Sequence, residues 1–307
     1  MSRPAGGECR KDAAGWEGED GQCDSGIELV HLAIIHCVPA VALCCIAQLP
    51  REVLEIQNDL FQSMVKVPCE QPLFREGKKG VGDTLRESCG SFQRGKTPLH
   101  LAVYLEQPSV IQALIHKGVN PGLQDRNGNT PLHLACEQQY LQCAQQLLRG
   151  SAPPEGTVQT HGHQQDLQLQ NWQGLACLHI STLKGNIPMM SLLLESGANI
   201  DVREGTSGKT PLHLAVECHN RRAVQFLLRN GAYVDAQMYN GCTPLHLAVG
   251  RKDAAIAAIL SHSGADTLLR NMEDETAQDL ADGNDDLLAL LPFDDLKISG
   301  KPVVCSE

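Results

Sequence analysis

A six-residue string recurs along this chain at a nearly constant interval, and this repeat constrains the fold more than any other feature. The string TPLHLA begins at Thr97, Thr130, Thr210 and Thr243, and a degraded copy, ACLHIS, begins at Ala176. Successive copies lie 33, 46, 34 and 33 residues apart. Such a period is typical of proteins that stack one supersecondary unit many times. The chain is therefore predicted to form a solenoid in which each unit contacts only its neighbours.

The residue types of the repeat explain why each unit begins with a helix. Gly241 permits the positive φ of a turn, Thr243 can cap a helix, and Pro244 occupies the first helical position, where its missing N–H costs nothing. The second helix is an apolar run that ends before a glycine, such as Phe226–Leu228 before Gly231. With this period the hexapeptide resembles the ankyrin repeat, which implies an all-α solenoid of about six helix-turn-helix units with projecting hairpins.

Half of the twelve histidines occupy one slot of the repeat, and we interpret them as imidazoles hydrogen-bonded within their repeat. They are His31, His100, His133, His179, His213 and His246. His161, His163 and Asp166 could begin a metal site, but the chain has no Cys-x-x-Cys pair to complete a structural zinc site. We predict no catalytic residue, no cofactor and no metal ion.

The composition of the chain indicates which partners it can bind and in which cell compartment it is expected. The formal charge of −11 argues against direct binding of nucleic acid, which needs clustered basic residues. Only 4% of residues are aromatic, so the core must be aliphatic. The thirteen cysteines form no obvious paired framework, and residues 1–28 lack the pattern of a secretory signal. We expect reduced thiols in the cytoplasm or nucleus.

Residues 29–49 are apolar enough to suggest a membrane span, but four residues interrupt them: His31, His36, Pro39 and Gln48. Acidic residues also predominate before the stretch, which is the wrong balance for an anchor. We predict a buried helical pair here.

The repeats and the gaps between them divide the chain into five parts. In order, they are a disordered N-terminal arm (1–27), repeat one (28–62), a flexible insertion (63–96), repeats two to six (97–270), and a C-terminal cap with an acidic tail (271–307). Repeat one starts with the truncated copy ELVHLA at Glu28, and a loop insertion at 149–166 explains the interval of 46. A degenerate extra repeat is the competing interpretation of 63–96, although this segment lacks the usual paired leucines and Gly-Ala.

The insertion ends in a string that matches the phosphate-loop motif, Gly90–Thr97 (GSFQRGKT). A phosphate loop follows a hydrophobic strand and opens a helix with free N–H groups, whereas Pro98 removes a donor here. Gly95–Thr97 also recurs as Gly208–Thr210 at the start of a later repeat. We therefore interpret this string as the turn of the repeat.

Two groups of residues are candidates for partner binding. Alignment of the repeats on Gly-x-Thr places five residues at matching hairpin tips: Arg126, Trp172, Thr206, Tyr239 and Met272. Aromatic side chains at such tips are typical interface anchors, although Trp172 could instead pack under the 149–166 loop.

The second group is acidic. The last 37 residues hold ten acidic and two basic side chains. They form either a solvated cap or an arm that pairs with a basic partner surface, in which case the pairing residues are Asp285, Asp286, Asp294 and Asp295.

A short string near the N-terminus, Asp24–Ile27, is a candidate regulatory motif. Asp24, Ser25, Gly26 and Ile27 resemble a phosphodegron, in which phosphoserine binds a ubiquitin-ligase receptor, but Leu29 stands where the second serine belongs. Six ankyrin units, this motif and an acidic end together resemble the inhibitor-of-kappa-B family. The stretches at 166–180 and 291–301 are similar to the epsilon branch of that family in particular.

The resemblance implies a non-enzymatic inhibitor that holds Rel/NF-kappa-B dimers in the cytoplasm, with possible nuclear shuttling, and blocks their binding to DNA. It also implies a kinase and a ubiquitin ligase acting at Ser25. An ankyrin adaptor that recruits partners to a ligase or scaffold is the alternative, and the fold does not separate the two.

Overall fold

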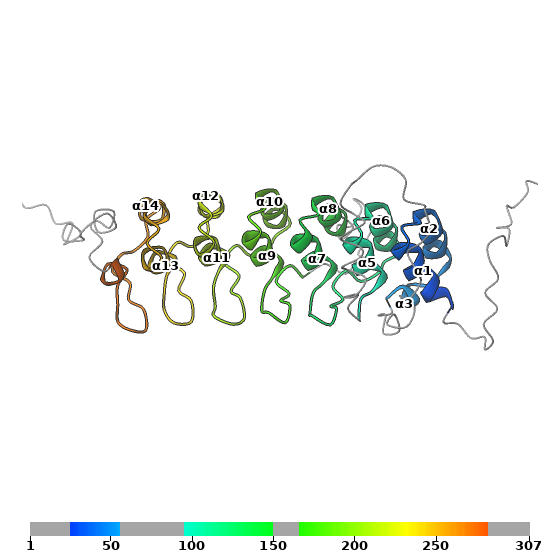
Figure 1. Ribbon diagram of the computed structural model, residues 1–307, viewed down its shortest axis with the longest axis horizontal. Helices are drawn as coiled ribbons and strands as arrows, with labels where there is room; N and C mark the ends of the chain where they lie inside the picture. Colours follow the sequence, from blue (N-terminus) through cyan, green and yellow to red (C-terminus); the bar gives the residue numbers. More distant parts are fainter. Residues whose placement is uncertain (1–24, 56–94, 150–165, 282–307) are drawn as a thin grey trace, which may run out of the picture.

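The computed structural model describes residues 25–55, 95–149 and 166–281, which form an elongated stack of helix pairs (Figure 1). Figure 1 shows two rows of helices along the stack, with hairpins projecting beyond the inner row. The inner helices are α1 (Ser25–Ile35), α5 (Pro98–Tyr104), α7 (Pro131–Gln138), α9 (Cys177–Leu183), α11 (Pro211–Glu217) and α13 (Pro244–Gly250). The outer helices are α2 (Pro39–Gln48), α6 (Pro108–His116), α8 (Leu141–Arg149), α10 (Ile187–Glu195), α12 (Arg221–Arg229) and α14 (Ala254–His262). The predicted all-α ankyrin solenoid is confirmed.

The four intact TPLH copies start their helices as the sequence predicts. In each, proline occupies the first helical position, directly after a threonine with an extended backbone. Gly241 has a φ of +80°, and Gly95 and Gly208 have φ values of +86° and +73°. Gly95 and Thr97 thus form the turn and cap of α5, which confirms our interpretation of the phosphate-loop string.

From the second repeat to the sixth, a histidine links each repeat to the next one. Within a repeat, Nδ1 accepts the backbone N–H of the helix-capping residue at 3.0–3.3 Å. On its other side, Nε2 donates to a carbonyl oxygen of the following repeat at 2.9–3.2 Å. These pairs are His100 to Asn129, His133 to Leu175, His179 to Val202, His213 to Cys242 and His246 to Glu275. The predicted bond within the repeat is confirmed for these five histidines, and the bond between repeats is an addition to it.

Helix α1 begins earlier than the repeat pattern indicates. We expected a helix after Glu28, with 25–27 in the N-terminal arm, but α1 starts at Ser25. The capping threonines of the four intact copies precede proline, which disfavours a helical backbone at the residue before it, whereas the cap of α9, Ala176, precedes Cys177. Leu29 replaces that proline, so the helix can continue upstream through Glu28.

The first repeat docks on the second despite the long segment between them. Helices α1 and α2 contact α5 and α6, respectively. The side chain of Gln107 donates to the Ile34 carbonyl at 2.7 Å, and Lys117 Nζ donates to the Ala47 carbonyl at 2.8 Å. We expected a slack connection at this point, whereas the two repeats are directly bonded to each other.

The apolar stretch at 29–49 forms a helix pair as predicted, but only part of it is buried. Ala42 and Ile46 face the core, whereas Val38, Val41 and Leu43 are exposed. Since α2 is the first outer helix, its free side has no neighbouring repeat among the described residues. None of the helices in 25–55, 95–149 and 166–281 combines the length and apolar character needed to cross a membrane.

The described stack ends in the beginning of a seventh repeat. The short 3-10 helix η1 (Asp279–Ala281) follows Thr276. Asp279 takes the place of the repeat histidine, because its Oδ2 accepts from both the backbone N–H and the hydroxyl of Thr276 at 2.8 Å. Most of the 63–96 insertion, residues 150–165 with His161 and His163, and the chain after Ala281 lie outside the described residues.

Candidate functional site

The exposed row of hairpin tips is the first part of the candidate site. Trp172, Tyr239 and Met272 are large apolar residues with exposed fractions of 73%, 52% and 78%. Arg126 and Thr206, the other two residues predicted at tips, are exposed as well. Large side chains at projecting tips offer a partner contact area without leaving gaps in the core of the solenoid.

Backbone hydrogen bonds hold neighbouring hairpins side by side. The N–H groups of Trp172, Tyr239 and Met272 donate to carbonyls of the preceding hairpin at 3.0, 2.9 and 2.9 Å. Since each hairpin is bonded to the one before it, the tips form a continuous strip with fixed spacing.

The structure corrects the alignment in one hairpin. There the bond to the preceding hairpin comes from Gly205, whose N–H donates to the Gly174 carbonyl at 3.0 Å, and not from Thr206. The interval of 34 residues before Thr210 explains this shift, because the extra residue lies within the hairpin. Gly205 therefore corresponds to Trp172, and Thr206 is the additional tip residue.

The indole of Trp172 is anchored at one edge. Its Nε1 donates to the Arg126 carbonyl at 2.7 Å, while its ring is mostly exposed. The bond fixes the orientation of the ring, so less side-chain entropy is lost when a partner binds. The alternative, packing of Trp172 under the 149–166 loop, concerns a segment of which 150–165 lies outside the described residues.

A groove lies between these hairpins and the inner helices of repeats two to four. It has a volume of about 670 Å³. Its lining includes Tyr104, Leu183 and Lys184 at the ends of inner helices, together with Trp172 from the hairpin row. Sequence reasoning missed these helix-end residues, because they lie outside the recurring hexapeptide and differ in type between repeats.

Lys96 closes one end of the groove and is nearly buried. Its Nζ lies 4.4 Å from the centroid of the Tyr104 ring, a cation–π contact. Burial lowers the pKa of Lys96, while the nearby carboxylates of Asp125 and Glu137 oppose that shift. Lys96 therefore packs against the Tyr104 ring in the lining of the groove, which is a different role from the phosphate contact that the motif would suggest.

The remaining predicted site residues lie at the two ends of the stack. Ser25, Gly26 and Ile27 form the first turn of α1, whereas Asp24 lies outside the described residues. The four tail residues also lie outside them: Asp285, Asp286, Asp294 and Asp295. Across the described ranges no cluster of three His, Cys, Asp or Glu side chains is placed to hold a metal ion.

Comparison with known proteins supports this architecture. Residues 71–160, 155–238 and 178–271 match the ankyrin-repeat family model. The chain is 54% identical to human NF-kappa-B inhibitor epsilon over 92% of its length, and it spans 49% of that relative. It is also 32% identical to NF-kappa-B inhibitor alpha from Sus scrofa, covering 91% of this chain and 76% of the relative.

A solved structure extends the likeness to three dimensions. The ankyrin-repeat domain of Bcl-3, described as a member of the IkappaB protein family, superposes with a TM-score of 0.67 at 32% identity. The match covers 89% of this chain and 99% of the Bcl-3 domain. The repeat pattern, the fold and these relatives together show that the chain belongs to the inhibitor-of-kappa-B family of ankyrin-repeat proteins.

Proposed function

We propose that this chain is a non-enzymatic inhibitor that binds Rel/NF-kappa-B dimers, retains them in the cytoplasm and blocks their binding to DNA. The observation that carries the proposal is the strip of linked hairpins with Trp172, Tyr239 and Met272 exposed along it. Two of the relatives named above are NF-kappa-B inhibitors, which supplies the class of partner.

The physical basis of the proposed inhibition is steric and electrostatic. A rigid strip of aromatic and thioether side chains provides contact area on one side of the stack. The acidic end of the chain adds complementarity to a basic DNA-binding surface, and the same charges compete with DNA phosphates for it. Retention in the cytoplasm follows if the bound chain covers the nuclear-localisation segment of the dimer.

We further propose that Ser25 is a contact for a kinase and a ubiquitin-ligase receptor, but too weak a contact to drive rapid degradation. The motif has one phosphoacceptor, since Leu29 occupies the place of the second serine. In addition, Ser25 is the first residue of α1, so the helix must open before the motif can bind in an extended form.

The test uses full-length Trp172→Ala and Tyr239→Ala variants and a purified Rel dimer bound to fluorescent DNA. Each substitution should weaken binding to the dimer by about tenfold, because truncation of an aromatic anchor typically costs more than 1 kcal/mol. The midpoint of thermal unfolding should stay within about 2 °C, because both side chains are mostly exposed.

Leu268→Ala is the matched control, because Leu268 is also exposed but is not one of the predicted tip residues. Unchanged affinity in both tip variants would exclude the hairpin strip as the binding surface. If the wild-type chain binds the dimer but leaves its DNA complex intact, an adaptor role fits better than inhibition.

A further inference from the structure

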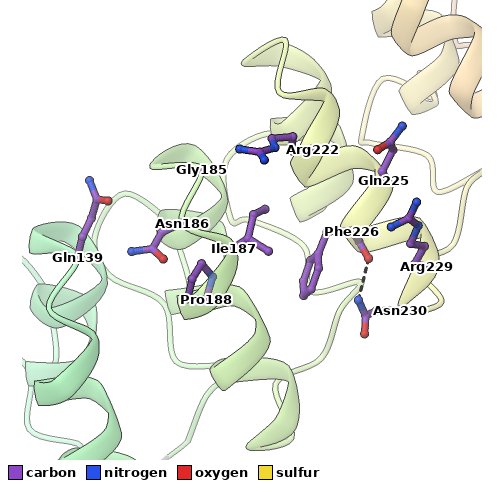
Figure 2. Close-up of a pocket in the computed structure, with 10 residues that line it drawn as sticks. All are labelled: Gln139, Gly185, Asn186, Ile187, Pro188, Arg222, Gln225, Phe226, Arg229 and Asn230. Atoms are coloured by element: carbon purple, nitrogen blue, oxygen red, sulfur yellow. Dashed lines mark hydrogen bonds between the residues drawn. The ribbon is translucent and has the colours of Figure 1, made fainter.

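A second concave surface lies on the outer helices, away from the hairpins. Figure 2 shows this cleft, which has a volume of about 740 Å³ and is lined mainly by α10, α12 and the loop before α10. Ile187, Pro188 and Phe226 supply its apolar part. The outer row is separated from the hairpins by the inner helices (Figure 1), so the cleft is distinct from the proposed Rel-binding strip.

Arginines of α12 make the cleft basic. Arg222 and Arg229 are exposed and line it, and none of the residues lining it is acidic. In the described ranges neither guanidinium forms a salt bridge with a carboxylate. In a chain with a formal charge of −11, two unpaired arginines beside apolar side chains form a local positive site.

The fold itself does not require this charge. Helix α12 contains three arginines, whereas α6, α10 and α14 contain neither arginine nor lysine and α8 contains one arginine. All five helices occupy the same position in their repeats, so packing needs no basic residue there. The charge is a property of this part of the stack and not of ankyrin helices in general.

The spacing of the arginines indicates what they fit. Arg222 and Arg229 are seven residues apart on one helical face, a distance of about 10 Å along the axis. On a peptide in the extended polyproline II conformation, which has three residues per turn, two side chains three residues apart lie on the same face and are about 9 Å apart. We propose that the cleft binds an extended acidic segment of a partner protein, with carboxylates at positions i and i+3 and apolar residues between them.

The two halves of the cleft take different parts of such a segment. Arg222 and Arg229 each pair with one carboxylate, which steers association and sets the register. The apolar side chain between the carboxylates lies against Ile187 and Phe226, which are already half-buried. Gln225 is exposed between the arginines and donates to the peptide backbone.

The experiment measures binding of a fluorescein-labelled peptide, Gly-Ser-Asp-Leu-Phe-Asp-Ser-Gly, to the full chain by fluorescence anisotropy. Arg222→Glu combined with Arg229→Glu should weaken binding by about tenfold or more, because like charges then face each other. Binding should also weaken with added salt. The Asn-for-Asp and Ala-for-Leu-and-Phe versions of the peptide should each bind more weakly.

Gln225 allows a test that removes no packing. Gln225→Glu should weaken binding by about threefold, because the new carboxylate pairs with Arg222 and Arg229 on the same helix face. Gln225→Lys should strengthen binding by a similar factor. These opposite directions separate a charge effect from a loss of folding.

Arg203→Glu combined with Lys252→Glu is the matched control, since both residues are exposed and basic but lie outside the cleft. The proposal is overturned if this control weakens binding as much as the double change on α12, or if the double change has no effect. It is also overturned if neutralising Asp285, Asp286, Asp294 and Asp295 raises peptide affinity several-fold, because the occupant is then the chain's own tail. Binding of a Rel dimer should be unchanged in the α12 variant, so failure here leaves the proposed function intact.

Discussion

At the scale of single residues, the buried histidine does most to connect neighbouring repeats. Its Nδ1 accepts a backbone N–H of its own repeat, and its Nε2 donates to a carbonyl of the next repeat, as in His213. Only the neutral ring can accept with one nitrogen and donate with the other. Burial lowers the pKa of His100 and of His213 from 6.5 to about 4, although their bonds to backbone carbonyls partly oppose this shift.

These lowered pKa values predict that the chain loses stability in mild acid. The stabilising effect of a neutral buried histidine is fully present above its unfolded pKa of 6.5 and is lost as the pH falls towards the folded value of about 4. Between pH 7.5 and pH 5.0, each of these two residues should therefore lower the free energy of unfolding by about 2 kcal/mol. Urea unfolding followed by circular dichroism at the two pH values measures the change.

A single substitution assigns the effect to the histidines. His213→Asn removes one titrating group, so the loss between the two pH values should become smaller in this variant even though the variant is less stable at pH 7.5. Equal unfolding free energies for the wild-type chain at both pH values would contradict the prediction.

At the scale of the elements, the hairpins depend on close contact between backbones. Gly174 has a φ of +76°, and a Cβ added to it would lie 2.7 Å from the backbone nitrogen of Gly205. The two hairpins thus approach more closely than any side chain at this position allows.

Gly174→Ala should destabilise the chain by more than the cost of a positive φ alone, which is about 1–2 kcal/mol for alanine. Gly197→Ala is the control, because Gly197 also has a positive φ, +94°, but no atom lies within 4 Å of its added Cβ. The difference between the two variants in urea unfolding measures the close contact. If both variants lose the same stability, the hairpins can separate without cost.

The recurring hexapeptide made the helix starts predictable. Proline and threonine act through the backbone within two or three residues, so the starts after Thr130 and Thr243 could be read directly. The bonds from histidine to the next repeat were not predictable in this way, since they join residues such as His133 and Leu175, 42 positions apart. They depend on how the repeats stack.

The candidate site could be predicted only in part, because some of its features depend on how neighbouring repeats stack. The exposure of Trp172 and Tyr239 follows from their place in hairpins of known type. The extra residue at Thr206 was missed, because a fixed alignment on Gly-x-Thr cannot show on which side of a hairpin an insertion falls. The cleft beside α12 combines three repeats and contains no motif, so it emerged only from the structure.

At the scale of the whole molecule, charge is concentrated at one end of the chain. Ten of its 36 acidic residues lie in the last 37 positions. If these residues face a basic surface of a Rel dimer, replacing Asp285, Asp286, Asp294 and Asp295 with asparagine should weaken binding. The affinity for the dimer should fall about tenfold at 50 mM salt but only about twofold at 300 mM salt, because salt screens exposed charges. Titration calorimetry measures both values, and a loss independent of salt would favour the capping role.

At the N-terminal end, the motif at Ser25 leads us to predict that the chain resists signal-induced degradation. Ser25 alone supplies a phosphate, so the receptor loses the charge-assisted hydrogen bonds of a second one, each worth about 1.5–3 kcal/mol. Because α1 is docked on α5, opening of the motif also costs tertiary contacts. In a chase after stimulation, the wild-type chain and Ser25→Ala should therefore have equal half-lives. Rapid loss of the wild type that disappears in the variant would refute this prediction.

The histidine bonds give the stack a direction. Each repeat from the second to the sixth donates to the one that follows it, and the series stops at Asp279, a side chain that accepts but does not donate onward. If the first repeat detaches, no histidine of the second repeat loses its acceptor. If the last hairpin detaches, His246 loses the Glu275 carbonyl. Detachment of the first repeat therefore breaks the bonds from Gln107 and Lys117 but leaves the histidine series intact, whereas detachment of the last hairpin shortens that series.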